Sequence, residues 1–357
     1  MIPISKPFIG DAEKQAVLEV LESGMLVQGP RAAKLETKFA EVCGTKYAIA
    51  TSSGTTALHV ALLAHGIGNG DEVITTPFTF IASVNSILYV GAKPVFVDIQ
   101  EDTFNINPDL IEAAITPKTK AILPVHLYGY PCDMDKINSI AQRHGLVVIE
   151  DACQAVGATY KGKPVGSFGT GCFSLYATKN IMAGEGGMIT TDDEAIMKRC
   201  RMIRNHGMER RYYHDMIGYN FRLSDLHASI GLVQIGRLNE FTEKRRTNAN
   251  FLNQNITSVV TPKVQPLYES VWHQYTIRLD GGRNRDAAVK QLNDAGIGTG
   301  IFYPVPANQQ SYLVELGYGN LKLPVTQRLA NEVISLPVHP QLSQADLDLI
   351  VHEVNKL

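Results

Sequence analysis

Seven short apolar runs recur through the first two-thirds of the chain and constrain its fold more than any other feature. They are Tyr47–Thr51, Glu72–Thr76, Pro94–Asp98, Ala121–Val125, Leu146–Glu150, Gly171–Leu175 and Gly187–Thr191. Helical patterns lie between several of these runs, at Thr56–His65, Pro108–Ile115 and Asp133–His144. Near-continuous apolar strands separated by helices are typical of a sheet covered on both faces. The sequence therefore predicts an α/β fold with a mostly parallel seven-stranded sheet between helices.

The remainder of the chain predicts a second, smaller domain. A chain of 357 residues is longer than one ordinary core accommodates. The further elements we expect are a helix over Asp193–Asn205, a long helix over Ser224–Asn255, strands over Val271–Leu279 and Gly298–Tyr303, and a terminal helix over Gln344–Lys356. We therefore predict a large domain over residues 1–244 and a small C-terminal α+β domain over residues 245–357.

Composition excludes several classes of function. Hydrophobic residues make up 45% of the chain, charged residues 19%, and the formal net charge is −2. This balance offers no basic excess for nucleic acid or for an anionic membrane. No run approaches the ~18 apolar residues of a membrane span. The five cysteines are scattered with no Cys-x-x-Cys pair, which argues against a metal site or a disulfide framework and makes us expect a cytoplasmic protein.

Lys179 is the most informative residue for the chemistry of this chain. It lies between the runs Gly171–Leu175 and Gly187–Thr191, so we expect it on a turn between two buried strands, where desolvation lowers the pKa of an amine. A neutral amine can condense with an aldehyde. Asp151 directly follows another run, Leu146–Glu150. A lysine that carries the cofactor as a Schiff base and a carboxylate that keeps a pyridine nitrogen protonated are what pyridoxal phosphate (PLP) chemistry needs.

A phosphate site is predicted where the first run ends. Residues 51–58, Thr-Ser-Ser-Gly-Thr-Thr-Ala-Leu, follow a predicted strand and open a predicted helix, whose N-terminal N–H groups suit a phosphate. Gly54 allows close approach of the backbone, and Thr55 and Thr56 add hydroxyl groups. Ser174 is a further candidate donor. An ordinary Ser/Thr helix cap is the alternative interpretation of this segment.

Two aromatic residues are candidates for stacking on the pyridine ring. Phe78 and Phe80 both lie in Thr76-Pro-Phe-Thr-Phe80, at the end of a predicted strand. We predict that Phe80 is the stacking residue, although either side chain could instead belong to the core. Cys153 and Cys172 flank the predicted site, and we interpret them as packing residues.

The order and spacing of many short segments resemble the DegT/StrS family of nucleotide-sugar aminotransferases, which are PLP enzymes of fold type I. The likeness covers almost the whole chain. It rests on Pro7–Gly10, Ser23–Pro30, Glu36, Ser53–Leu58, Pro124–Gly129, Glu150–Gln154, Lys179–Asn180, Gly184–Gly187, Gly218–Asp225 and Leu336–Pro340.

The resemblance implies a role for individual residues. Lys179 would hold the cofactor, Asp151 would pair with its ring nitrogen, and Gln154 would lie near its ring hydroxyl. The implied phosphate ligands are Thr55, Thr56 and Ser174. Asn220 would reach the phosphate from a neighbouring subunit, which implies a homodimer with shared active sites. A capped helix start before Ser224 is the alternative for Asn220 and for Arg222.

The substrate contacts are less closely matched. Many members of the family have histidines where this chain has Phe302, before Tyr303, and Asn308. Tyr303, Arg222 and His273 are our candidates for substrate contact. His273 and His339 could approach the cleft, but a structural role is the alternative for each of these two histidines. The sequence indicates no role for Glu185.

Together these features predict a PLP-dependent aminotransferase. The resemblance implies that L-glutamate donates the amino group to a keto-sugar of a nucleotide-linked hexose, for amino-sugar or surface polysaccharide biosynthesis. We favour a 4-keto over a 3-keto sugar. Other possibilities are a sugar dehydration, which in this superfamily replaces the lysine with histidine, and a regulatory or sensory protein that kept the scaffold without turnover. The presence of Lys179 argues against both alternatives.

Overall fold

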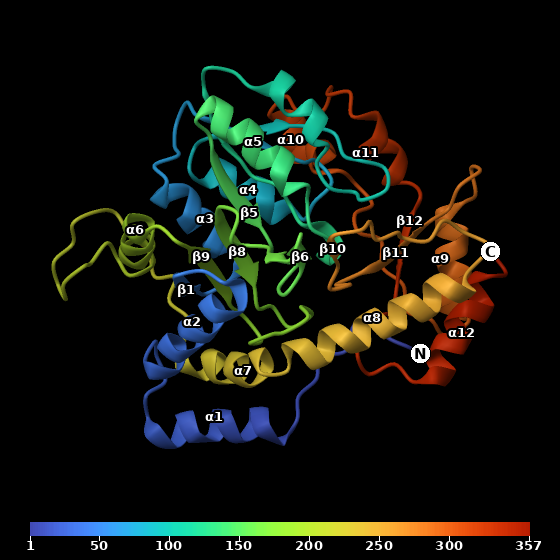
Figure 1. The fold of residues 1–357 in the computed structure, drawn as a ribbon, viewed down its shortest axis with the longest axis horizontal. Helices are drawn as coiled ribbons and strands as arrows, with labels where there is room; N and C mark the ends of the chain where they lie inside the picture. The colour runs from blue at the N-terminus through green and yellow to red at the C-terminus, as the bar shows by residue number, and fades with distance from the viewer.

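A seven-stranded sheet runs through the larger part of the molecule (Figure 1) in the computed structural model, which describes residues 1–357. The strand order is β1-β9-β8-β5-β4-β2-β3. The strands are β1 (Tyr47–Thr51), β2 (Glu72–Thr75), β3 (Lys93–Phe96), β4 (Thr119–Ile122), β5 (Val147–Asp151), β8 (Thr170–Ser174) and β9 (Gly187–Thr191). All pairs are parallel except the two that involve β9, which runs antiparallel to β1 and β8. The predicted α/β fold and mostly parallel sheet are confirmed.

Helices cover both faces of this sheet because alternate strand residues point to opposite faces. In β1, Ile49 packs in one core cluster with α3, whereas Ala48 and Ala50 pack in another with α2. The helices of the larger part are α1 (Asp11–Ser23), α2 (Pro30–Cys43), α3 (Gly54–Ala64), α4 (Ile81–Tyr89), α5 (Met134–His144), α6 (Glu194–Arg204) and α7 (Asp225–Ile235). A third cluster joins α5 to β2, β4 and β5 through Ile74, Ile122 and Val148.

The helix predicted over Ser224–Asn255 is two helices. The first is α7, and the second is α8 (Leu238–Asn255), which crosses the molecule toward the C-terminal part (Figure 1). The break falls at Gly236 and Arg237, and its physical reason is that glycine is a poor helix former. Ala249 and Leu252 of α8 pack in a core cluster with C-terminal residues. The domain boundary after residue 244 remains a prediction.

The C-terminal part is built around a two-stranded antiparallel sheet of β11 (Tyr275–Arg278) and β12 (Val333–Leu336). Its helices are α9 (Arg285–Asp294), α10 (Ser311–Glu315), α11 (Pro324–Leu329) and α12 (Gln344–Val354). A small three-stranded sheet, β10 (Tyr268–Glu269), β6 (Thr159–Tyr160) and β7 (Lys163–Pro164), connects this part to the larger one.

Two further predictions of local structure were wrong. The strand expected over Gly298–Tyr303 is absent, and the segment makes only an isolated bridge between Gly300 and Ser335. Its glycines weaken a strand, and Pro304 directly after it cannot donate to a ladder. The helix expected over Pro108–Ile115 is two 3₁₀ turns, Pro108–Leu110 and Glu112–Ala114.

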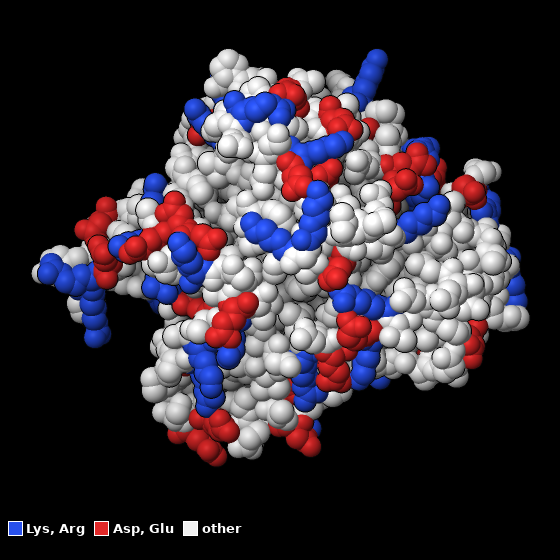
Figure 2. Space-filling model, in the orientation of Figure 1, with Lys and Arg blue, Asp and Glu red and all other residues white.

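Charged side chains of both signs are interspersed over the face shown in Figure 2, in small groups rather than in one large basic or acidic area. This distribution agrees with the small net charge of −2. None of the helices combines the length and the apolar character that crossing a membrane requires.

Candidate active site

A cavity of about 410 Å³ lies where the strands of the large sheet end, the usual place for a ligand on such a sheet. Nine of the predicted site residues line it. Six come from the large sheet and its loops: Gly54, Thr55, Asp151, Gln154, Ser174 and Lys179. The other three are aromatic or imidazole side chains: Phe80, His273 and Tyr303. Residues far apart in the sequence therefore meet in one hollow.

Lys179 lies on the turn between β8 and β9, as the sequence predicts. Its backbone N–H donates to the Tyr176 carbonyl oxygen at 2.9 Å, which closes the turn. Burial of the amine lowers the pKa of Lys179, and the neighbouring Cys153 and Asp151 only partly oppose this effect. A lysine with a lowered pKa offers a larger fraction of neutral, nucleophilic amine at a given pH.

Asp151 is the last residue of β5, and the residue is only 5% exposed. Its two carboxylate oxygens have different partners. Oδ2 accepts a hydrogen bond from the Ser83 hydroxyl at 2.6 Å, and Oδ1 accepts one from the Cys153 backbone N–H at 3.1 Å. The carboxylate is therefore held in one orientation at the cavity wall.

The N-terminus of α3 forms part of the cavity wall. Gly54 and Thr55 begin this helix and line the cavity, where the first N–H groups of a helix have no intrahelical partner. A Cβ atom on Gly54 would stand 2.8 Å from Ser174 Cβ and 2.9 Å from Cys153 Sγ. Glycine thus lets the helix end come close to Ser174, and this cradle of N–H and hydroxyl donors fits a phosphate.

Thr56 has a different place. Its hydroxyl donates to the Ser53 carbonyl oxygen at 2.8 Å and accepts from the Ser53 N–H at 2.9 Å. It belongs to the capping box of α3 and does not line the cavity. For Thr56, the geometry therefore favours the alternative interpretation as a helix cap.

The two candidate aromatic residues are separated by their burial. Phe78 is fully buried and stacks on Phe104 in the core, with ring centroids 6.1 Å apart. Phe80 is 55% exposed and lines the cavity, where its ring centroid is 6.1 Å from that of Tyr303. Only Phe80 is placed to stack on a ring inside the cavity.

Polar side chains line the cavity beside Asp151. Gln154 accepts from the Tyr128 N–H at 2.8 Å through Oε1 and donates to the Tyr303 hydroxyl at 3.1 Å through Nε2. His273 Nδ1 lies 3.2 Å from Asn180 Oδ1, and burial holds the pKa of His273 well below its usual value. A neutral His273 can therefore exchange hydrogen bonds with a ligand without adding charge.

Several candidate residues are not brought into this cavity. Asn220 is exposed, and Arg222 donates to Asn205 Oδ1 at 2.7 Å; neither lines the cavity of its own chain. His339 and Asn308 are buried elsewhere. Phe302 does line the cavity.

Sequence reasoning missed some residues that line the cavity. Thr79 lies just before α4 and Ser83 lies in its first turn; Ser83 contacts Asp151, and Thr79 contacts Ser83. A pair of hydroxyl residues spaced by one helical turn in an otherwise apolar segment was the available signal. Ile4 and Ser5 also line the cavity, and nothing in their local sequence indicated it. Glu185 lines the cavity and is exposed.

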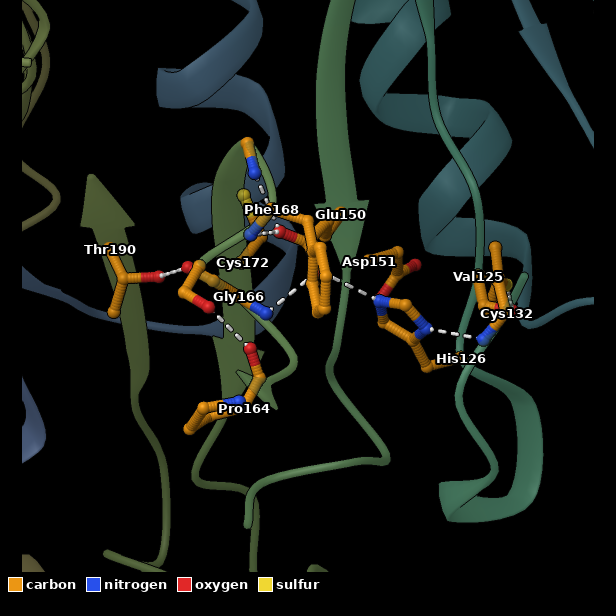
Figure 3. A network of polar contacts seen from close by, with 12 residues as sticks. Val125, His126, Cys132, Glu150, Asp151, Pro164, Gly166, Phe168, Cys172 and Thr190 are labelled. Atoms are coloured by element: carbon orange, nitrogen blue, oxygen red, sulfur yellow. Dashed lines mark hydrogen bonds and ion pairs between the residues drawn. The ribbon is translucent and has the colours of Figure 1, made fainter. Parts of the chain in front are cut away.

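A second polar network supports β5 on the side away from the cavity (Figure 3). Glu150 precedes Asp151, and both Glu150 and His126 are fully buried. His126 Nδ1 accepts from the Cys132 N–H at 3.0 Å, so Nε2 carries the proton and donates to Glu150 at 3.1 Å. Three backbone N–H groups, those of Gly166, Phe168 and Gly169, also donate to the Glu150 carboxylate.

Comparison with known proteins identifies the family of this chain. The sequence model of the DegT/DnrJ/EryC1/StrS aminotransferase family matches residues 7–355. The chain is 46% identical to the pleiotropic regulatory protein of Geobacillus stearothermophilus over 343 residues, covering 94% of this chain and 91% of that one. It is 41% identical to the spore coat polysaccharide biosynthesis protein SpsC of Bacillus subtilis over 377 residues, covering 100% and 97%.

A solved structure adds a likeness in three dimensions. Spr1654 of Streptococcus pneumoniae, whose name describes it as a sugar aminotransferase, has been solved in its PLP-form. It superposes with a TM-score of 0.94 at 31% identity, covering 99% of this chain and 98% of that one. The fold is therefore that of the PLP-dependent sugar aminotransferases, and this chain belongs to the DegT/DnrJ/EryC1/StrS aminotransferase family.

Proposed function

We propose that this aminotransferase uses PLP to move an amino group from L-glutamate to the keto carbon of a nucleotide-linked hexose, with a 4-keto sugar favoured over a 3-keto sugar. One observation supports the proposal above all others. The Lys179 amine, the Asp151 carboxylate and the N-terminus of α3 line the same cavity of about 410 Å³. An amine, an acid and a phosphate cradle are the set of groups that this cofactor requires.

The cofactor, when bound, supplies an aldehyde carbon that can carry the amino group and a ring that withdraws electrons. Lys179 would hold the cofactor through its side-chain amine, which the lowered pKa makes more nucleophilic. The free amine of Lys179 would act as general base at the α-carbon of the amino donor and as general acid toward the cofactor. The same lysine moves a proton in the opposite sense when the keto-sugar receives the amino group.

The other residues of the cavity bind and orient. Asp151 keeps the ring nitrogen protonated, and Phe80 stacks on the ring. The N–H groups of Gly54 and Thr55, together with the Ser174 hydroxyl, bind the phosphate. Gln154 lies beside the ring hydroxyl.

We propose that the substrate meets Tyr303 and His273, since both line the cavity. Asn220 and Arg222 lie outside the cavity of their own chain, and Asn220 is exposed. We propose that these two residues complete the site of a second copy in a homodimer. The name of the B. subtilis relative supports a product used in polysaccharide biosynthesis.

A regulatory protein without turnover is the second candidate, and the name of the G. stearothermophilus relative favours it. Against it, the cavity retains Lys179, Asp151 and Ser174 together. A protein that only senses a ligand has no need of a buried lysine with a lowered pKa.

Reduction with borohydride followed by peptide mapping tests the proposal. The expected result is a PLP label on the peptide that contains Lys179. In a separate assay, unreduced enzyme should release 2-oxoglutarate from glutamate over many turnovers when a nucleotide-linked keto-sugar is added. Parallel reactions with 4-keto and 3-keto sugars distinguish the position of amination. A label on another side chain, or no label, would refute the assignment of Lys179, and label without 2-oxoglutarate would favour the regulatory protein.

A further inference from the structure

We propose that Ser83, supported by Thr79, is a positioning residue that donates a hydrogen bond to the Asp151 carboxylate and keeps it aimed at the cofactor's ring nitrogen. The inference rests on the proposed function, because it concerns the partner that Asp151 has in that function. Thr79 Oγ1 lies 2.8 Å from Ser83 Oγ, which in turn lies 2.6 Å from Asp151 Oδ2. Thr79, Ser83 and Asp151 are 4%, 1% and 5% exposed.

The direction of both hydrogen bonds follows from the number of protons. An ionised carboxylate can only accept, so the single hydroxyl proton of Ser83 is donated to Asp151. Ser83 then has no proton left for Thr79, and Thr79 must donate to Ser83. The O–H bond of Thr79 therefore points toward Ser83, and the O–H bond of Ser83 points toward the carboxylate of Asp151. A distance of 2.6 Å is that of a charge-assisted O–H···O⁻ bond.

No lysine, arginine or histidine forms an ion pair with Asp151, although the Lys179 amine is near enough to interact with its charge. The Ser83 hydroxyl is therefore the main donor to Oδ2. The other carboxylate oxygen of Asp151 accepts only from the Cys153 N–H, at 3.1 Å. Ser83 also lies in the first turn of α4, the end of a helix that favours a negative charge. A hydrogen bond donated to a carboxylate and a nearby helix N-terminus both stabilise its negative charge.

This arrangement determines where a proton between the carboxylate and a ring nitrogen resides. With Ser83 donating, the negative charge on Asp151 is stabilised and the proton stays on the nitrogen. Without that donor, the carboxylate competes more strongly for the proton and is held in place by the Cys153 N–H alone. The ring would then withdraw electrons less well, and the proton transfer that Lys179 performs would slow.

The experiment compares the holoenzyme with three variants that carry ¹⁵N-labelled PLP. Ser83→Ala removes the donor, Ser83→Thr retains a hydroxyl, and Thr79→Val removes only the second donor. Ser86→Ala is the matched control, because Ser86 is also fully buried on α4 but its hydroxyl donates at 3.0 Å to the Ser83 backbone carbonyl oxygen and not to Asp151. The readouts are the ring ¹⁵N chemical shift as a function of pH and the rate of the half-reaction with glutamate.

We expect Ser83→Ala to move the ¹⁵N signal toward that of an unprotonated ring. The half-reaction should slow about tenfold to a hundredfold, because a hydrogen bond to a charged group is lost. Ser83→Thr should restore most of both readouts, Thr79→Val should shift both in the same direction by less, and Ser86→Ala should change neither. An unchanged ¹⁵N signal in Ser83→Ala, or an equal change in Ser86→Ala, would overturn the inference. If Ser83→Ala does not fold, an unchanged signal in Thr79→Val would overturn it instead. Wild-type protein that takes up no PLP on Lys179 would refute the proposed function itself.

Discussion

Gly54 and Ser174 approach each other so closely that a Cβ atom added to Gly54 would stand 2.8 Å from the Cβ of Ser174. Gly54 begins α3 and Ser174 ends β8, so the contact sets the distance between a helix N-terminus and the sheet. Both residues line the cavity. The width of the proposed phosphate cradle therefore depends on the absence of one methyl group.

The first prediction concerns this contact. Gly54→Ala should push the start of α3 away from Ser174, because the added carbon would also meet Cys153 Sγ at 2.9 Å. Overpacking of this kind costs about 1–3 kcal/mol, so the Kd for PLP should rise roughly tenfold to a hundredfold. Gly68→Ala is the control, since the nearest atom to its added Cβ is 3.7 Å away. Equal Kd values for the two variants, measured by equilibrium dialysis, would contradict the cradle.

Replacement of Lys179 distinguishes the binding of PLP from the transfer of the amino group. Lys179→Ala removes the amine that we propose as the attachment point and the proton carrier, while the phosphate cradle at α3 stays intact. Transamination should fall to the background rate, and PLP should still bind weakly and be removed by gel filtration. An exposed lysine, Lys46, provides the control as Lys46→Ala. Turnover in Lys179→Ala would mean that another group moves the proton.

The carboxylate can be changed without a change in shape. Asp151→Asn keeps an oxygen for the Cys153 N–H, but its amide nitrogen cannot accept from Ser83 and carries no charge. Loss of one such electrostatic group typically lowers kcat about 10²–10³-fold. Steady-state kinetics should show this loss in kcat, with the KM for the sugar little changed. An Asp151→Asn enzyme with near-native turnover would contradict the role of Asp151 at the ring nitrogen.

The buried hydrogen-bonded pair of Glu150 and His126 should contribute to the stability of the fold. Glu150 accepts four hydrogen bonds, one from His126 and three from backbone N–H groups (Figure 3). Glu150→Gln replaces one acceptor oxygen with an NH₂ group that faces donors, so we expect a loss of about 3 kcal/mol in the free energy of unfolding. Urea unfolding at neutral pH measures this loss. Glu112→Gln, an exposed carboxylate, should barely change the midpoint, and similar midpoints for the two variants would refute the argument.

The sheet could be predicted from the sequence because each strand is an apolar run. The bounds of β1 and β9 agree to the residue, and those of β5 and β8 differ by one. The predictions of secondary structure failed where the apolar pattern of the sequence and the packing of the backbone differ. A helical periodicity continues across Gly236 although the backbone turns there, and the apolar run Gly298–Tyr303 lies beside β12 without joining it beyond one bridge.

The site was predictable where its residues follow strands, since the ends of neighbouring parallel strands must lie close together. Lys179, Asp151 and Gly54 are of this kind. Ser83 is not, because it lies inside a helix whose position against β5 depends on tertiary packing. Phe80, the predicted stacking residue, lines the cavity, whereas the core encloses Phe78. The spacing of two aromatic residues does not by itself separate them, because burial depends on tertiary packing.

The last prediction concerns pH. Burial lowers the pKa of His65 to about 4, with Asp193 opposing and Arg199 adding to the effect. The neutral ring lies 2.8 Å from the Thr170 hydroxyl through Nε2. An unfolded chain binds a proton at His65 below about pH 6.5, whereas the folded protein does so only near pH 4. The unfolded state therefore binds more protons in this window, and the stability falls as the pH falls from 6.5 to 4.

His65→Gln removes the titration but keeps a polar side chain beside Thr170. Between pH 7 and pH 4.5 the wild-type protein should lose about 2 kcal/mol more stability than this variant, as a folded-state pKa lowered by more than two units implies. Urea unfolding at the two pH values measures the difference. The contributions of the other buried histidines cancel because both proteins contain them. His352→Gln, a change at a surface histidine, should retain the wild-type dependence. Parallel stability curves for the wild-type protein and His65→Gln would show that His65 titrates alike in the folded and unfolded chain.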